Sequence, residues 1–409
     1  MDNEQSFHGV YNYKNIHMIR ALLLLILLLS ILIGCNNDND FETNNPTNPI
    51  KDCTPLRPLS DPTYEILNIR IGTWDGSTII SQSGEIITVG SRDIIGMTKM
   101  SLFVTDENGG LIREVDFNVP EKNSRALSLS EDSVGNLYVI GYSYNESRLE
   151  NRILTIAKLS ADKDLQWIRT YNEGEDITGS HIGILDNDII VCTGERDGDL
   201  VFLTITDSGD EIVNKIIESE SYASPAGMLI TKDKGIIITG SEDRQLHLAS
   251  YNENAEIIWE KTYGPKSKAG RSTIELENGD LVTVGRITHL QGNTNIVESQ
   301  NALILKTDKN GNLIWEKEIG TEEFSNDGQS IKKNINEGFV LTGYSIQCGY
   351  TDHFLYFIND EGESINMVNY NDFGAVRGQN ILKLPDDRNI ITGSFNGPSF
   401  FLNVDNFGM

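Results

Sequence analysis

Cysteine is scarce in this chain, which has four cysteines among its 409 residues, at positions 35, 53, 192 and 348. No two of them have the C-x-x-C spacing that is typical of zinc or redox sites. So few cysteines also exclude a dense disulfide framework. The composition, 38% hydrophobic and 23% charged, instead predicts that most of the chain folds.

Positive charge is also scarce, because 33 basic residues stand against 60 acidic ones and the net charge is −27. Residues 1–35 contain two acids and two bases, so the remainder keeps this charge. The negative electrostatic field of so acidic a protein repels phosphate backbones and anionic lipids, which argues against nucleic acid as a partner. Solubility is the simplest role of the acidic surface.

Motifs of catalysis and metal binding are absent as well. The chain has no G-x-S-x-G, no P-loop and no H-E-x-x-H. Beyond residue 35 its histidines are His181, His247, His289 and His353, and no two of them have a ligand-like spacing. We therefore expect no metal, no cofactor and no catalytic residue that the sequence can identify.

No hydrophobic run reaches the roughly 20 residues of a membrane span. The longest covers residues 21–33 and follows Arg20, which fits the h-region and positive n-region of a signal peptide. We take residues 1–34 as this peptide, with Met18 as the hypothetical true start. The run ends in Leu32-Ile33-Gly34-Cys35, which resembles the bacterial lipobox. The resemblance implies acylation of Cys35 and a membrane anchor through this lipid.

Residues 35–63 form a predicted tether that holds five of the ten prolines. Its start, residues 36–42, is acidic and resembles the export signal of surface lipoproteins of the Bacteroidota. That resemblance implies a protein of the cell envelope, anchored in the outer membrane by lipid and exposed at the surface.

The rest of the chain, residues 64–409, is repetitive. A short hydrophobic run that ends in glycine recurs seven times, with the glycines at positions 90, 141, 194, 240, 285, 343 and 393. A period near fifty with short strands is typical of propeller blades. The last unit has only three strands, and residues 64–72 resemble the missing fourth. The sequence predicts an all-β fold, a single seven-bladed β-propeller with four-stranded blades, whose last blade is closed by both termini.

One unit carries a recognisable signature. Asp308, Gly311 and Trp315 match the Asp-x-x-Gly and following tryptophan of quinoprotein-like (PQQ-like repeat) propellers, and other units match it in part. The resemblance implies a fold, not an activity, because this superfamily includes both quinone-dependent dehydrogenases and a non-enzymatic outer-membrane assembly lipoprotein. The dehydrogenases have eight blades, and no motif here places a quinone.

Loops that join fourth to first strands, and second to third strands, share one rim of a propeller. We expect ligand binding on that rim, at Trp74, Arg196, Asp243, Arg271, Arg286, His289, Tyr350 and Arg377. Arginine suits bidentate recognition of carboxylates, so alanine at Arg271, Arg286 and Arg377 should weaken binding and leave stability nearly unchanged. Charge balance among neighbouring acids is the competing explanation.

These observations favour a non-catalytic binding or scaffold module for a glycan or an outer-membrane protein partner. A glycan-active hydrolase or lyase that uses the funnel is the alternative, and a quinone-dependent oxidoreductase is a third. Converging carboxylates in the funnel would favour the hydrolase, whereas calcium-dependent dye reduction would favour the oxidoreductase.

The lipobox makes a direct prediction. Cys35→Ala removes the thiol that accepts the lipid, so the precursor should stay unprocessed and incorporate no labelled fatty acid. Metabolic labelling followed by gel analysis measures both. Normal labelling of the variant would exclude the lipoprotein interpretation.

Overall fold

The computed structural model describes residues 64–67, 76–145, 151–185, 189–218, 223–264, 267–290, 297–320, 325–334, 337–347, 350–370, 376–384, 388–395 and 399–404. All of them belong to one compact unit, Cys53–Met409. The predicted signal peptide, Cys35 and the tether lie outside the described residues. No helix occurs in the described part, and none there is long and apolar enough to cross a membrane.

The described strands form seven four-stranded antiparallel sheets, each called a blade below. Blades one to four are β2–β5 (Thr78–Ile80, Ile86–Ile94, Met97–Thr105, Leu111–Phe117), β6–β9 (Asn123–Glu131, Leu137–Tyr144, Ile153–Leu159, Leu165–Tyr171), β10–β13 (Thr178–Ile184, Ile190–Arg196, Asp199–Ile205, Glu211–Ile217) and β14–β17 (Ala223–Ile230, Ile236–Glu242, Gln245–Tyr251, Ile257–Tyr263). Blades five to seven are β18–β21 (Ser267–Glu275, Leu281–Leu290, Val297–Thr307, Leu313–Ile319), β22–β25 (Ser325–Lys333, Phe339–Gln347, Tyr350–Ile358, Ser364–Tyr370) and β26, β27, β28 with β1 (Val376–Lys383, Asn389–Phe395, Ser399–Val404, Tyr64–Leu67).

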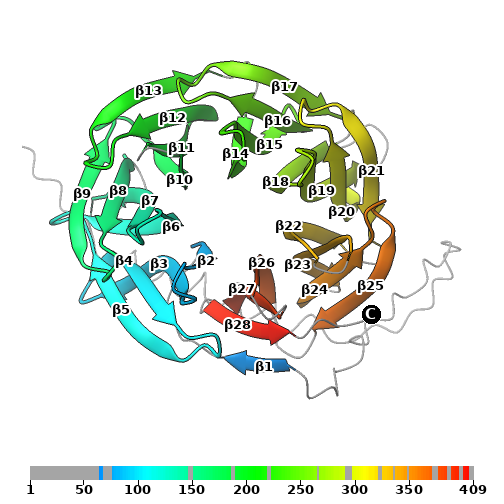
Figure 1. Cartoon of the computed structure of the whole chain (residues 1–409), viewed down its shortest axis with the longest axis horizontal. Coiled ribbons are helices and arrows are strands. Elements are labelled where there is room, and N and C mark those ends of the chain that lie inside the picture. Colours follow the sequence, from blue (N-terminus) through cyan, green and yellow to red (C-terminus); the bar gives the residue numbers. More distant parts are fainter. Residues whose placement is uncertain are drawn as a thin grey trace, which may run out of the picture. The chain divides into compact units, whose positions relative to one another are not determined.

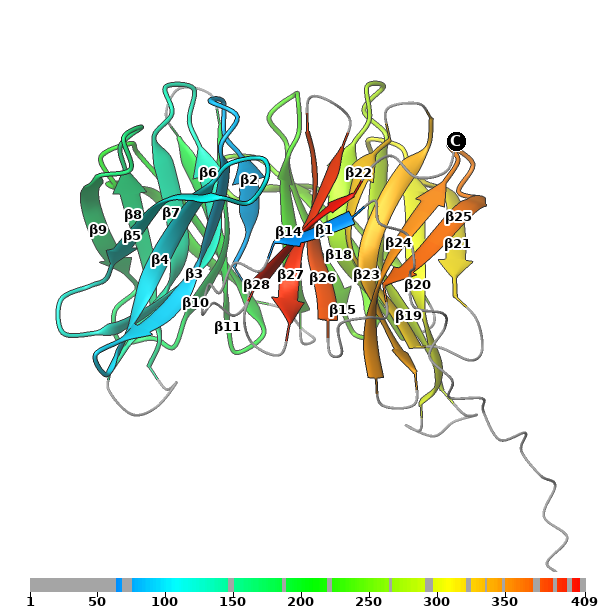
Figure 2. The same cartoon turned by 90° about the horizontal axis from the view of Figure 1, so that it is seen from below.

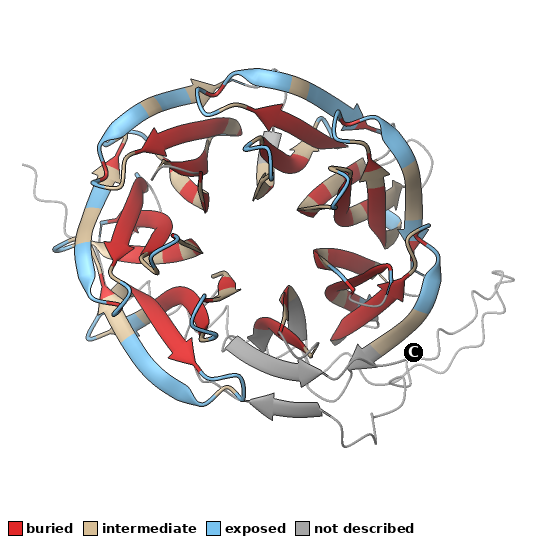
Figure 3. Ribbon diagram, in the orientation of Figure 1, coloured by how far each residue is buried: buried red, intermediate tan, exposed pale blue. Residues whose placement is uncertain are grey.

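The blades are arranged around an axis, with each first strand innermost and each fourth strand outermost (Figures 1 and 2). This arrangement confirms the all-β propeller prediction. It also explains why the second strands are hydrophobic throughout, since each is covered on both faces by neighbouring blades. All eight residues of β7 are buried, whereas the fourth strands of blades one to five are largely exposed (Figure 3).

The hydrophobic core lies between the blades. One cluster joins Ile87 and Met100 of blade one to Leu129 and Val139 of blade two. Each interface of this kind removes apolar surface from water, and each Å² buried stabilises the fold by about 25 cal/mol. The core is therefore divided into layers, and each layer depends on two neighbouring blades.

The glycines that end the second strands allow a close backbone contact. In blade five Gly285 pairs with Gly270 of the first strand, and a Cβ on Gly285 would lie 1.9 Å from the carbonyl oxygen of Ala269. The matching glycine of blade two, Gly141, would place a Cβ 1.8 Å from the carbonyl oxygen of Arg125. No side chain fits there, so these glycines have a structural role.

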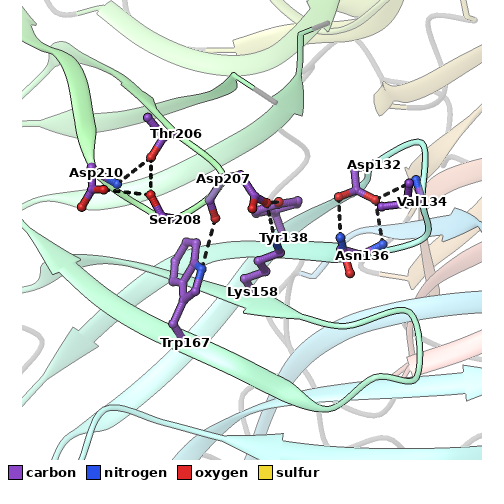
Figure 4. A network of polar contacts seen from close by, with 10 residues as sticks. All are labelled: Asp132, Val134, Asn136, Tyr138, Lys158, Trp167, Thr206, Asp207, Ser208 and Asp210. Atoms are coloured by element: carbon purple, nitrogen blue, oxygen red, sulfur yellow. Dashed lines mark hydrogen bonds and ion pairs between the residues drawn. The ribbon is translucent and has the colours of Figure 1, made fainter. Parts of the chain in front are cut away.

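Tryptophans on fourth strands contact the hairpin of the next blade. The indole nitrogen of Trp167 donates to the carbonyl oxygen of Asp207, 3.2 Å away, and Lys158 and Tyr138 bind the carboxylate of the same aspartate (Figure 4). In later blades Trp259 packs against Gly311, and Trp315 packs against Gly362. The tryptophan and the turn glycine of the repeat thus meet across the blade interface.

The hairpin turns themselves are fixed by aspartate and asparagine. Figure 4 shows Asp132, whose Oδ1 accepts hydrogen bonds from the backbone nitrogens of Val134 and Asn136, at 3.0 and 2.8 Å. Asp308 makes the same bonds to Asn310 and Asn312. Turn chemistry therefore accounts for the aspartates at these positions.

Strands from the two ends of the domain meet in blade seven. β1 pairs antiparallel with β28, with Tyr64 opposite Val404 and Leu67 opposite Phe401. This pairing covers the edge that β28 would otherwise expose.

Deletion of residues 64–72 should therefore leave β28 unpaired. We expect the free energy of unfolding to fall by about 3 kcal/mol, from the lost ladder of hydrogen bonds and its packing. Urea titration followed by fluorescence measures the change. Deletion of residues 43–51, a segment of the same length in the predicted tether, is the control. Equal stability of the two variants would contradict the pairing.

Candidate binding channel

A cavity of about 450 Å³ lies at the centre of the domain. Six of the seven first strands, and residues 76 and 77 just before β2, contribute to its lining. Its walls are formed by these residues: Gly76, Ser77, Leu127, Ser128, Ser180, His181, Pro225, Ala226, Gly227, Met228, Arg271, Ser272, Thr273, Gln329, Ser330, Gln379 and Asn380. Hydroxyl and amide groups dominate, so this axial channel is polar.

A β-bulge selects one channel residue in each of six first strands. In blade five the register shifts between Gly270 and Ser272, so Arg271 is the extra residue with no partner in β19. The six bulge residues are Leu127, Ser180, Ala226, Arg271, Gln329 and Gln379. All six line the channel. Six blades thus each direct one bulge residue into the channel. The three long polar ones, Arg271, Gln329 and Gln379, come from the consecutive blades five, six and seven.

A buried carboxylate holds this polar side in place. Asp327 of β22 has a fully buried side chain, and its Oδ1 accepts a hydrogen bond from Nε2 of Gln329 at 2.9 Å. Its Oδ2 accepts from Arg286 and from the Tyr344 hydroxyl, both at 3.3 Å, and lies 3.7 Å from Nη2 of Arg271. Asp327 therefore orients two channel residues at once.

Two guanidinium groups share this one carboxylate, which leaves an excess of positive charge beside the channel. The side chains of Arg271 and Arg286 keep 31% and 38% of their surface exposed, so each can also contact a ligand. None of the described lining residues is acidic. A protein of net charge −27 thus presents a cationic and amide-rich wall at its centre.

His181 is a neutral member of the lining. Burial lowers its pKa to about 4, against a smaller opposing effect of a backbone hydrogen bond with Ala226. The imidazole is therefore uncharged near pH 7, and a base of such low pKa is poorly matched to general base catalysis there.

The structure places the predicted rim residues in several different strands and turns. Arg271 lies in β18, Arg286 and His289 lie in β19, and the positions of Tyr350 and Arg377 fall in β24 and β26. The prediction that loops carry them was wrong, because the strands extend further than the hydrophobic runs indicated. Only the turn position of Asp243 and the end position of Arg196 fit it. Trp74, and the side chains of Tyr350 and Arg377, lie outside what the structure describes.

Several rim residues are bound to neighbours instead of to each other. Arg196 pairs with Glu175 and Asp199, each at 3.1 Å, and Nε2 of His289 lies 2.5 Å from Glu318. Asp243 and Arg286 line a second cavity of about 380 Å³ at the edge of blades four and five. Charge balance therefore explains Arg196 and His289, while Arg271 and Arg286 combine charge balance with access to solvent.

A sequence pattern marks the channel-lining positions. Gly-x-polar recurs in the first strands as Gly179-Ser180-His181, Gly270-Arg271-Ser272, Gly328-Gln329-Ser330 and Gly378-Gln379-Asn380. The middle residue of each triplet is the bulge residue. Gln329 and Gln379 become channel residues through the bulge, which only the strand pairing reveals.

Comparisons with known proteins support the fold alone. No family model matches the chain, and no curated protein matches it. Among solved structures, YCF48 bound to D1 peptide aligns with a TM-score of 0.54 at 11% identity, over 86% of this chain and 98% of that chain. A 6-phosphogluconolactonase-like protein from Bacteroides fragilis aligns with a TM-score of 0.50 at 12% identity, over 78% and 95%. Propellers with different activities thus share this architecture.

The role of Asp327 can be tested by Asp327→Asn, which keeps the side-chain shape and removes the charge. Two guanidinium groups would then face each other without compensation, so we expect the free energy of unfolding to fall by about 2–3 kcal/mol. Urea unfolding measures it. Asp210→Asn, at an exposed pair with Arg169, is the control and should change little. Similar small changes in both variants would mean that Asp327 does not organise the site.

Proposed function

We propose that the protein is a lipid-anchored, closed seven-bladed propeller of the cell envelope that binds a carboxylate-bearing ligand in its axial channel. The anchor rests on the lipobox at Cys35, and the acidic residues that follow support exposure at the outer membrane. The pairing of β1 with β28 supports the closed ring. The proposed role is binding, with no chemical change of the ligand.

The observation that carries this proposal is the polar wall formed by Arg271, Gln329 and their anchor, Asp327. A guanidinium next to a primary amide offers several donors to one carboxylate, and both are already oriented by the buried aspartate. Prior orientation lowers the entropy cost of binding. Backbone hydrogen bonds of the first strands keep the wall rigid.

The same lining gives less support to catalysis. Glycoside hydrolysis commonly needs two carboxyl groups about 5–10 Å apart, and none of the lining residues described here is acidic. The neighbour from Bacteroides fragilis shows that the architecture can be associated with a lactonase-like protein, but the resemblance does not extend to a site. The peptide complex of YCF48 shows a propeller in a binding role.

The test is a ligand screen with the purified chain against arrays of acidic glycans and acidic peptides. For any ligand found, Arg271→Ala and Gln329→Ala should each weaken affinity at least about tenfold, the effect of losing one hydrogen bond to a charged group. Arg113→Ala, on the outer strand β5, should leave affinity unchanged. Titration calorimetry measures the affinities, and thermal melting confirms that the variants fold.

Two results would overturn the proposal. One is an affinity that neither channel variant changes, which would place the ligand elsewhere. The other is the absence of any binder among the acidic probes. Arg271→Ala should also lower stability modestly, since it removes one partner of Asp327. This corrects the expectation that the rim arginines are free of structural duties.

A further inference from the structure

Three potential metal ligands meet on one face of blade four. Glu242 ends β15, His247 lies in β16 and Glu260 lies in β17. One ligand atom from each residue lies within 4.8 Å of the other two. The spacing along the chain gives no hint of this group, because the residues are brought together by strand pairing.

The pairing explains the geometry. His247 lies opposite Gly240 of β15, so Glu242 is its diagonal neighbour on that strand. On the other side Ala249 lies opposite Glu260, which makes Glu260 the diagonal neighbour of His247 on β17. Diagonal neighbours on one face are within reach of long side chains. The absent side chain at Gly240 leaves room for the imidazole between the two carboxylates.

The distances fit a small cation. Nε2 of His247 lies 2.8 Å from Oε1 of Glu260 and 3.7 Å from Oε2 of Glu242. Ligand atoms about 2.1 Å from a tetrahedral Zn²⁺ lie about 3.4 Å from each other. The observed separations bracket this value, so small rotations of the glutamates would complete the site.

The surroundings favour a metal over a simple ion pair. His247 is only 9% exposed, and the three residues line a cavity of about 60 Å³ between blades three and four. Leu200 and Ile217 form part of its wall, and Glu218 of blade three also lines it. Negative charge is thus concentrated in a partly enclosed space.

We propose that Glu242, His247 and Glu260 bind one Zn²⁺ ion, with the fourth position open to the cavity. An imidazole and two carboxylates form a mixed nitrogen and oxygen donor set that suits zinc, whereas calcium prefers six to eight oxygen ligands. The cavity has space for a water molecule as the fourth ligand. The ion would cross-link three adjacent strands of blade four.

The experiment uses the full-length chain, purified in detergent with a tag that contains no histidine. Titration with Zn²⁺ in competition with a chromophoric chelator should show one saturable site. Glu242→Gln and His247→Gln should each weaken it at least tenfold, and Co²⁺ bound to the unmutated chain should show the absorption of a tetrahedral complex. His289→Gln is the matched control. His289 lies next to one carboxylate only, that of Glu318, which also accepts a hydrogen bond from the amide of Asn301.

The outcomes separate clearly. One zinc ion per chain, lost in the two site variants and kept in the control, supports the site. Absence of saturable binding overturns it, and so does binding that Glu242→Gln and His247→Gln leave unchanged. Thermal melting in chelator shows whether the variants fold, and unaltered melting of Glu242→Gln with reduced zinc affinity separates metal binding from a structural role of the carboxylate.

Discussion

The architecture depends on a close backbone contact inside several blades, between the glycine of the second strand and the first strand, as at Gly141, Gly194, Gly285 and Gly343. At Gly285 and Gly141 no Cβ can be accommodated, so the first and second strands of these blades approach each other more closely than side chains would permit. The bulge that follows then turns one side chain per blade toward the axis. The crowded centre and the channel lining are consequences of the same contact.

Between blades, a second contact fixes the outer ring. Trp167, Trp259 and Trp315 each reach the hairpin of the next blade, where a turn glycine or a carbonyl oxygen receives the indole. The blades that these three tryptophans contact are therefore held by their neighbours both in the core and at the outer hairpins. This rigid setting is what allows Asp327, Arg286 and Arg271 to keep a defined geometry although they come from two different blades.

Much of the fold was predictable because it follows from periodicity. The seven glycine-ended runs located the second strands, and the similarity of residues 64–72 to a fourth strand located the partner of β28. The candidate site was less predictable. A bulge shifts the strand register by one residue, which decides whether Arg271 faces the channel or a neighbouring blade. Likewise, the approach of Glu242 and Glu260 to His247 depends on diagonal pairing across three strands, which sequence spacing does not reveal.

The pairing of β1 with β28 has a consequence for biosynthesis. A ribosome makes β1 first and β28 last, more than 300 residues later. Until β28 emerges, β1 has no partner. The six blades made before it then form an open arc with an unpaired strand edge at each end. Closing so long a loop costs roughly 5 kcal/mol of chain entropy. The late closure marks a period in which the nascent protein is exposed to proteases and to pairing with the wrong strand.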